Sequence, residues 1–309
     1  MDTVYAGIDV SSDSLAVGLR PLGEVLAYSR DESGIESLAS KLLDLEVSLV
    51  AIEATGGYES LVAAGLIAAG LSVVVVNPAQ VRSFAKACGT RAKTDRIDAA
   101  LIAHFAQAMD PDVRPLPDAD TRALSTLMQR RRQLVEMITK EKQRKSRADA
   151  ASLQSLQRSI AFLKGELAAI DKDIDDGIKA SPAWREKVEL LTSVPGVGPV
   201  VSRTMIAEMP ELGSLNRHQV AALTGVAPMT QQSGKWRGKS FICGGRANVR
   251  TALYQATLSA VRYNPQLATF YQRLVARGKP KKLALIAAAR KLVILLNAIL
   301  RDKKPWQNA

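Results

Sequence analysis

The fold of this chain is decided by residues 93–100, which read KTDRIDAA. Thr94 is a favourable N-cap residue, and apolar residues follow it at helical spacing, namely Ile97, Leu101, Ile102 and Phe105. We therefore predict a helix over residues 93–105 that places Asp95 and Asp98 on one face of its first turn. Two neighbouring acids repel each other. Either the positive end of the helix or a divalent cation compensates them, and the motif alone is more readily explained by two solvated acids.

Two more acids stand at the ends of predicted strands. Asp9 lies near the end of a β-branched segment, residues 3–10, and Glu53 ends a buried-type strand, residues 48–53. The remaining pattern up to Met109 predicts strands over 14–20, 24–29 and 73–76 and helices over 35–45 and 60–69, followed by further helix. The resulting order, βββαβαβα, is that of an RNase H-like fold.

The RNase H-like topology would bring these acids together. In it, the strand that ends at Glu53 lies beside the strand that bears Asp9, and the helix that bears Asp95 and Asp98 packs across the same edge. Taken singly, Asp9 is also explained as a turn residue and Glu53 as a surface acid. Four converging carboxylates would have raised pKa values unless cations neutralised them. Two metal ions held there could stabilise both oxygens of a phosphodiester displacement.

Composition narrows the classes of partner and cofactor. The formal net charge of +12 and the pI of about 9.8 favour a polyanionic partner, most often nucleic acid. The two cysteines, Cys88 and Cys243, give no disulfide framework and predict a reducing cytosol. The two histidines, His104 and His218, leave few options for a zinc site or a Ser–His–Asp triad. A catalytic metal is therefore expected on carboxylates, which favour Mg²⁺ or Mn²⁺.

A proline-rich linker, residues 110–117, is predicted to separate this part from a long helix that starts near Thr121. The helix is strongly basic, and its cations form either a solvated face or a nucleic-acid surface that includes Arg130, Arg131, Lys142 and Arg144. A heptad pattern follows at Leu153, Leu156, Ile160, Leu163, Leu167, Ile170 and Ile174. Its partner is either the preceding helix folded back or a second copy. We favour a hairpin that also helps to dimerise, and expect no membrane span in the chain.

Two glycine-containing segments mark the C-terminal part. Residues 193–198, SVPGVG, precede a helical run and resemble a helix–hairpin–helix, in which Gly196 and Gly198 would offer backbone N–H groups to a phosphate. An ordinary helix connection is the alternative. Residues 223–239 combine turn residues with Trp236 and three cations, Lys235, Arg237 and Lys239, which is typical of a phosphate-contacting loop. By residue type alone, Ser233 in this loop is more readily a turn residue than a nucleophile. Residues 246–300 are basic and largely helical, beginning with Arg246 and Arg250.

Taken in order, these motifs resemble those of the DEDD transposases of insertion sequences whose recombinase is guided by a bridge RNA. The motifs are Gly7-Ile8-Asp9, Ile52-Glu53-Ala54-Thr55-Gly56, Val76-Asn77-Pro78, Lys93-Thr94-Asp95 with Asp98-Ala99, Ser193 to Gly198, and Gly225-Val226-Ala227-Pro228 followed by Ser233-Gly234. The resemblance covers nearly the full length. It implies a RuvC-like catalytic domain over residues 1–115, a coiled-coil linker over 116–185, and a transposase domain with helix–hairpin–helix and serine loop over 186–309.

The resemblance also implies the roles of particular residues. Asp9, Glu53, Asp95 and Asp98 would be the metal-binding tetrad, and Ser233 would attack DNA to form a covalent phosphoserine link. The implied partners are a bridge RNA and the donor and target DNA, bound in part by Lys93 and the basic residues above, with the protein acting as a homodimer or homotetramer. The chain departs from the usual family pattern at Lys235-Trp236. Two alternatives remain open: a RuvC-like junction endonuclease that uses water, and a non-enzymatic nucleic-acid-binding protein.

Overall fold

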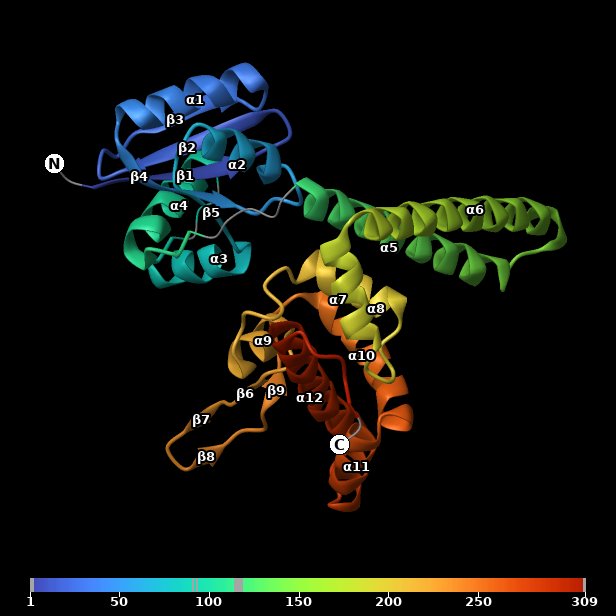
Figure 1. Ribbon diagram of the computed structural model, residues 1–309. Coiled ribbons are helices and arrows are strands. Elements are labelled where there is room, and N and C mark those ends of the chain that lie inside the picture. The colour runs from blue at the N-terminus through green and yellow to red at the C-terminus, as the bar shows by residue number, and fades with distance from the viewer. Residues whose placement is uncertain (1–2, 91, 93, 114–118, 308–309) are drawn as a thin grey trace. The chain divides into compact units, whose positions relative to one another are not determined.

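A computed structural model describes residues 3–90, 92, 94–113 and 119–307 (Figure 1). The chain divides into two compact units, Met1–Leu116 and Pro117–Ala309. Residues 114–117 of the predicted linker over 110–117 lie outside the described residues. The separate coiled-coil domain predicted over 116–185 stays a prediction, since its helices belong to the second compact unit.

The first unit is built on a mixed five-stranded sheet with the order β3-β2-β1-β4-β5. Its strands are β1 (Val4–Val10), β2 (Ser14–Arg20), β3 (Val25–Ser29), β4 (Val47–Glu53) and β5 (Val73–Val76). The first three strands pair antiparallel, whereas β4 pairs parallel with both β1 and β5. The element order predicted for an RNase H-like fold is confirmed, and β4 lies beside β1 as that topology requires.

Helices cover both faces of this sheet (Figure 1). They are α1 (Glu32–Asp44), α2 (Glu59–Ala68), α3 (Pro78–Ala87) and α4 (Asp95–Met109). One core joins alternate residues of β1 and β2, such as Ile8 and Val17, to α1 and α2. The other joins β4 and β5 to α3 and α4 through Ala51, Val74 and Ile102. Because successive strand residues face opposite sides, β1, β4 and β5 contribute side chains to both cores, whereas β2 and β3 contribute to the first.

Glycines in β1 and β2 allow α4 to approach the sheet very closely. A Cβ atom added to Gly7 would lie 2.0 Å from the backbone nitrogen of Ala103, and one added to Gly18 would lie 2.6 Å from the carbonyl carbon of Ala99. Both contacts are with helix backbone, which cannot move aside as a flexible side chain would. The two glycines therefore set the distance between α4 and the strands β1 and β2. Of these strands, β1 carries Asp9.

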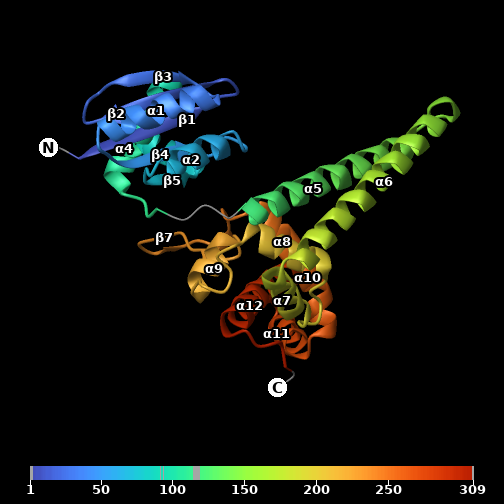
Figure 2. The ribbon, with the colours of Figure 1, turned by 45° about the horizontal axis from the view of Figure 1, so that its top comes forward.

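The second unit is mostly helical. Its helices are α5 (Ala119–Lys145), α6 (Ala150–Ala180), α7 (Pro182–Thr192), α8 (Pro199–Glu208), α9 (Arg217–Leu223), α10 (Ala247–Tyr263), α11 (Pro265–Ala276) and α12 (Lys281–Asp302). Helices α5 and α6 run side by side as a hairpin (Figure 2). The heptad residues Ile160 and Ile174 are buried, and the partner of α6 is the preceding helix folded back. A role of this hairpin in dimerisation stays a prediction.

Ion pairs tie the base of this hairpin to the helical body. Arg131 of α5 contacts Asp171 of α6 at 2.7 Å. Arg203 of α8 reaches the same carboxylate at 3.8 Å and also pairs with Asp175. The acidic stretch of α6 therefore neutralises cations from two neighbouring helices, and much of the pairing is partly buried, where ion pairs are screened less by salt than at the surface.

The core of the second unit gathers α7, α8, α10 and α12 around apolar residues such as Leu191, Met205 and Leu253. Among the described residues, α12 is long and apolar enough to cross a membrane by length and composition. Its residues Leu292 and Leu296 are nevertheless fully buried in this core. The helix thus contributes part of its surface to the core of this unit.

The segment between α9 and α10, where the sequence predicts a phosphate-contacting loop, contains regular structure. It contains four short strands, β6 (Pro228–Met229), β7 (Gln232–Ser233), β8 (Trp236–Arg237) and β9 (Phe241–Ile242). Strand β6 pairs with β9, and β7 pairs with β8, both antiparallel. We call residues 228–242 the arm. It extends away from α9 and α12 as a narrow two-stranded ribbon (Figure 1).

Candidate functional site

Two of the predicted acids are neighbours at the carboxyl edge of the sheet. Ile8 of β1 lies opposite Ile52 of β4 in parallel register, so Asp9 and Glu53 stand one residue beyond that pair on adjacent strands. Both side chains are half-buried. Because Gly7 lies against α4, Asp9, two residues further along the same strand, points to the α4 side of the sheet. The carboxyl edge of parallel strands is where α/β proteins commonly place their ligands.

The other two acids lie in the first turn of α4, as the sequence predicts. The hydroxyl of Thr94 accepts a hydrogen bond from the backbone N–H of Ile97 at 3.3 Å, which confirms the predicted N-cap. Asp95 is exposed and Asp98 is half-buried. The residue after Asp98 has its carbonyl oxygen within 2.6 Å of a Cβ built on Gly7, so the start of α4 lies over β1.

These placements support a pair of acids more strongly than a closed tetrad. Among the described residues, no group of three or more His, Cys, Asp or Glu side chains is arranged to hold a metal ion. The tetrad therefore stays a prediction. The donor chemistry at Asp9 and Glu53 still fits Mg²⁺, which proteins commonly bind through one or two carboxylates together with water and substrate phosphates. Lys93, predicted to bind nucleic acid, lies outside the described residues.

Ser233 is presented at the end of the arm. It pairs with Trp236 across the hairpin, so the turn consists of Gly234 and Lys235. Gly234 has φ of +53°, a left-handed conformation that glycine adopts without strain. The preceding strand residue, Gln232, accepts a hydrogen bond from Arg237 at 2.8 Å, which braces the same end of the ribbon. Ser233 is exposed, so its hydroxyl is open to a substrate.

Several cations that were predicted to bind nucleic acid have partners within the chain. Arg246 donates two hydrogen bonds to the Glu211 carboxylate at 2.7 and 2.8 Å and one to the carbonyl of Glu208 at 2.7 Å. Arg250 donates to the carbonyl of Gly244, and Arg131 contacts Asp171 as described above. These side chains stabilise the base of the arm and of the hairpin, and a role for them in binding nucleic acid stays a prediction.

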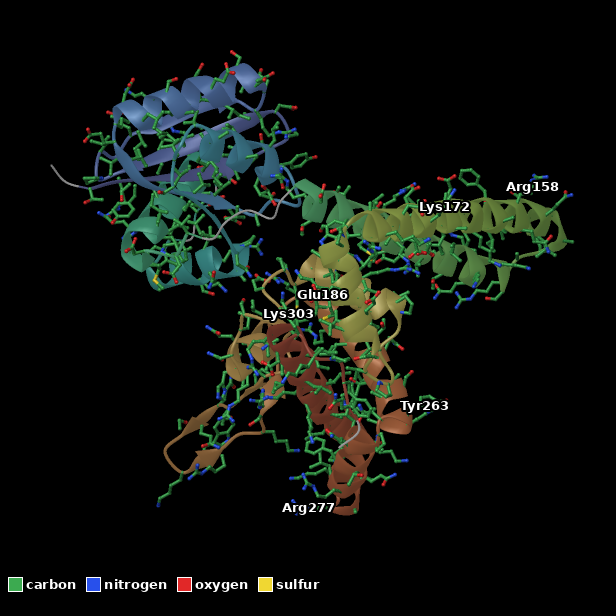
Figure 3. All side chains as sticks on the ribbon, viewed as in Figure 1. Arg158, Lys172, Glu186, Tyr263, Arg277 and Lys303 are labelled. Carbon is green, nitrogen blue, oxygen red and sulfur yellow. The ribbon has the colours of Figure 1, made fainter. Side chains whose placement is uncertain are left out.

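Other predicted cations are exposed. Those on α5 are Arg130, Lys142 and Arg144, and those on the arm are Lys235, Arg237 and Lys239. Arg144 forms an ion pair with Glu141 one turn away, a pairing that contributes little at the surface. Figure 3 shows nitrogen-ended side chains along the arm. The arm thus carries three solvent-exposed cations close in sequence to the candidate nucleophile, Ser233.

The two glycines of the predicted helix–hairpin–helix have different roles. Gly196 has φ of +99°, and a Cβ there would lie 2.5 Å from the backbone of Ala260 in α10, so this glycine permits close helix packing. Gly198 is the N-cap of α8, and a Cβ there would meet nothing within 4 Å. Of the two, Gly198 lies at the open helix start, where the prediction of a phosphate contact remains untested.

The second unit contains a long segment without acids, which the motifs do not reveal. No Asp or Glu occurs between Glu211 and Asp302, whereas fifteen Lys and Arg residues do, which exceeds the formal net charge of +12 for the whole chain. The arm lies within this acid-free segment. A scan for the spacing of acids, rather than for runs of cations, would have found it. Ser233 is therefore far from any acid in sequence, although Glu211 pairs with Arg246 at the base of the arm.

Comparisons with known proteins match both units. Residues 6–148 match the IS110 DEDD family described as "Transposase", and residues 188–272 match the family described as "Transposase IS116/IS110/IS902 family". The pilin gene-inverting protein of Moraxella bovis is 29% identical over 261 residues, which cover 82% of this chain and 80% of that protein.

Two further comparisons concern one protein of similar sequence and one solved structure. The 42 kDa protein of insertion element IS900 from Mycobacterium paratuberculosis is 25% identical, with 99% of this chain and 98% of that protein covered. The RuvC structure from Thermus thermophilus is 17% identical and covers 37% of this chain and all of that chain, with a TM-score of 0.26.

Proposed function

The chain belongs to the IS116/IS110/IS902 family of transposases, and from that premise we propose that it cuts and rejoins DNA through a covalent link between Ser233 and a DNA strand. The observation that carries the proposal is the exposed position of Ser233 at a hairpin end surrounded by cations in an acid-free segment. Such an environment attracts a phosphodiester and accommodates the negative charge that develops during its displacement.

The reaction conserves the phosphodiester bond energy. The Ser233 hydroxyl loses its proton and its oxygen bonds to phosphorus, while the bond from phosphorus to one deoxyribose oxygen breaks and that oxygen takes up a proton. The reverse reaction, with a hydroxyl from another strand as the attacking group, releases the serine and joins the new strands. No external energy source is required, because the number of phosphate ester bonds is unchanged at each step.

The acids of the first unit are proposed to hold the cation for this reaction. Asp9 and Glu53 would bind Mg²⁺ or Mn²⁺ with Asp95 and Asp98 nearby, and the ion when bound supplies Lewis acidity toward the phosphate and the attacking hydroxyl. An isolated serine hydroxyl is a weak nucleophile, and the segment that contains Ser233 carries no Asp or Glu that could act as a base. We therefore propose that acids and serine, which belong to different units, act at one phosphate.

The sequence specificity is proposed to come from a structured bridge RNA. The arm and α5 offer exposed cations, which contact phosphates but carry little sequence information. In RNA-guided systems, base pairing reads the sequence while the protein holds the backbones. We propose the same division here, with donor and target DNA paired to the RNA, in the bacterial cytosol and by a dimer or tetramer of the chain.

The test is a search for a covalent adduct. The protein is incubated with Mg²⁺, donor and target DNA and RNA from the flanking element, and is then denatured and resolved by gel electrophoresis. We expect a denaturant-resistant protein–DNA adduct that is lost in S233A and retained in S240A. The control is matched, because Ser240 is an exposed arm hydroxyl that lies 3.1 Å from the Thr230 hydroxyl. An unchanged adduct in S233A would refute the role of the serine.

A second function is favoured by the acid pair itself. Asp9 and Glu53 lie in a unit that does not contain Ser233, and such a site could activate water for junction cleavage. This alternative predicts free DNA ends without attached protein and full cleavage by S233A. Binding of DNA without cleavage under any metal condition would instead point to a non-enzymatic protein.

A further inference from the structure

The arm lacks a core of its own. Of residues 228–242, only Gly238 and Ile242 are half-buried, and all the others are exposed. The two ladders hold four residue pairs in total, Pro228–Ile242, Met229–Phe241, Gln232–Arg237 and Ser233–Trp236. A two-stranded ribbon of this kind is at best marginally stable in water. Its large apolar side chains are therefore not explained by packing within the arm.

Trp236 is the largest of these side chains and stands beside the candidate nucleophile. It is 58% exposed and is the cross-strand partner of Ser233, and such partners have Cβ atoms about 5 Å apart. The other two tryptophans, Trp184 and Trp306, are partly buried and pack against the core of the second unit. Trp236 thus differs from them in having no apolar surroundings of comparable size.

The indole is held in place although it is exposed. A Cβ added to Gly238 would lie 2.4 Å from the indole atom Cη2 and 2.7 Å from Cζ3, so the six-membered ring covers this glycine. The N–H of Gly238 in turn donates to the carbonyl of Gln231 at 3.2 Å. An aromatic ring that rests on the backbone loses less conformational freedom when a ligand stacks on it than a freely rotating one does.

The positive charge of the arm indicates which kind of partner would cover the exposed indole. Lys235 and Arg237 flank the indole in sequence, Lys239 follows, and the whole segment from residue 212 to 301 carries no acid. Cations along a ribbon with an exposed aromatic ring are the features that bind single-stranded nucleic acid, with phosphates on the cations and a base on the ring. An uncharged protein surface would not complement this excess of positive charge, whereas a nucleic acid would.

We propose that Trp236 stacks on the nucleobase next to the phosphate that Ser233 attacks. Because the serine and the indole are cross-strand neighbours, a base on the indole would bring its adjoining phosphate toward the serine hydroxyl. Trp236 is thus a positioning residue, since it holds the strand and takes no part in bond making. The inference rests on the proposed phosphoserine function, and binding and chemistry are tested separately below.

The first test follows the fluorescence of the full-length protein as single-stranded DNA that spans the cleavage point is added without divalent metal. Stacking on a base is expected to quench the exposed indole in the wild type and in W184F, and the quenching is expected to be lost in W236F. Equal quenching in W236F would overturn the proposal. Quenching that grows with protein concentration in the absence of DNA would also overturn it, because the indole would then bind a second protein chain.

The second test uses affinity and an abasic nucleotide. Removing an aromatic side chain on which one base stacks typically weakens binding about 5- to 150-fold. W236A should therefore bind the DNA more weakly than wild type by a factor in that range, whereas the affinity of W236F should stay within about threefold of wild type. Replacing the nucleotide beside the cleaved phosphate by an abasic one should weaken the wild type equally and leave W236A unaffected. Unchanged affinity in W236A, or equal sensitivity of both proteins to the abasic site, would contradict stacking.

These readouts separate the inference from the proposed function. S233A is expected to quench as the wild type does, because stacking precedes bond making. If no adduct forms in any variant while the quenching still depends on Trp236, the phosphoserine function fails and a nucleic-acid site remains. If adducts form at wild-type rate in W236A, the function stands and the positioning role is wrong.

Discussion

The sheet edge of the first unit and the arm of the second hold their candidate functional side chains in opposite ways. Asp9 and Glu53 stand on paired strands beneath a helix whose backbone touches Gly7, so their positions are fixed by packing. Ser233 and Trp236 stand on an exposed ribbon with four residue pairs and no core. Rigid scaffolds hold precise arrangements of charge, whereas ribbons of low contact density adapt to a substrate. We infer from this comparison that the acids are preorganised by packing, whereas the position of Ser233 adjusts when the arm binds its substrate.

The largest expected effect comes from removing charge at the preorganised edge. We predict that D9N and E53Q each lower the rate of adduct formation at least about 100-fold, the scale seen when one electrostatic catalytic group is lost. The check is single-turnover adduct formation at saturating Mg²⁺. D13N is the matched control, because Asp13 is an exposed acid in the turn that follows β1. Equal rates in D9N and D13N would contradict the assignment of Asp9.

Local patterns predicted the framework of this edge well. The strand over 14–20 and the N-cap at Thr94 are found as predicted, because alternation and capping are properties of neighbouring residues. The sequence favours the fold-back of α6 on α5 but does not decide it, since one heptad stripe fits either partner. The contact of Gly196 with Ala260 and the pairing of Arg246 with Glu211 could not be predicted, because they join residues far apart in sequence.

Packing at the edge can be broken without touching an acid. We predict that G7A lowers the free energy of unfolding of the first unit by about 3 kcal/mol, because the new Cβ would overlap backbone atoms of Ala99 and Ala103. Denaturant unfolding followed by circular dichroism measures this. G23A is a useful comparison, since a Cβ there meets nothing, and its cost comes only from a positive φ of +72°. A smaller loss in G7A than in G23A would show that α4 can move away from the sheet.

The arm should respond to charge rather than to packing. We predict that K239Q reduces the slope of log affinity against log salt concentration for DNA by about 1, with little effect on unfolding, because one phosphate contact is lost. K172Q serves as a control, since Lys172 is exposed on α6 next to Asp171 and Asp173 and outside the acid-free segment. Equal slopes for K239Q and wild type would remove Lys239 from the nucleic-acid surface.

The smallest effect concerns pH and the first unit. Burial, and secondarily the charge of Arg20, lowers the pKa of His104 below its usual value of 6.5. The ring packs edge-to-face on Phe84 at 5.0 Å. Because the unfolded chain takes up the proton first, this contribution to stability is complete above pH 6.5 and is lost as the pH falls below it. H104Q should therefore lose less stability than wild type between pH 7.5 and 5, and an equal loss would contradict the assignment.

The central claim is that one hydroxyl of the exposed arm becomes bonded to DNA. Its most direct measurement is mass spectrometry of the isolated adduct after nuclease and protease digestion. The account predicts a nucleotide phosphate on the peptide that contains Ser233, and on Ser233 itself when that peptide is fragmented. A nucleotide on Ser240, Thr230 or any residue outside the arm, or cleaved DNA with no modified peptide, would contradict it.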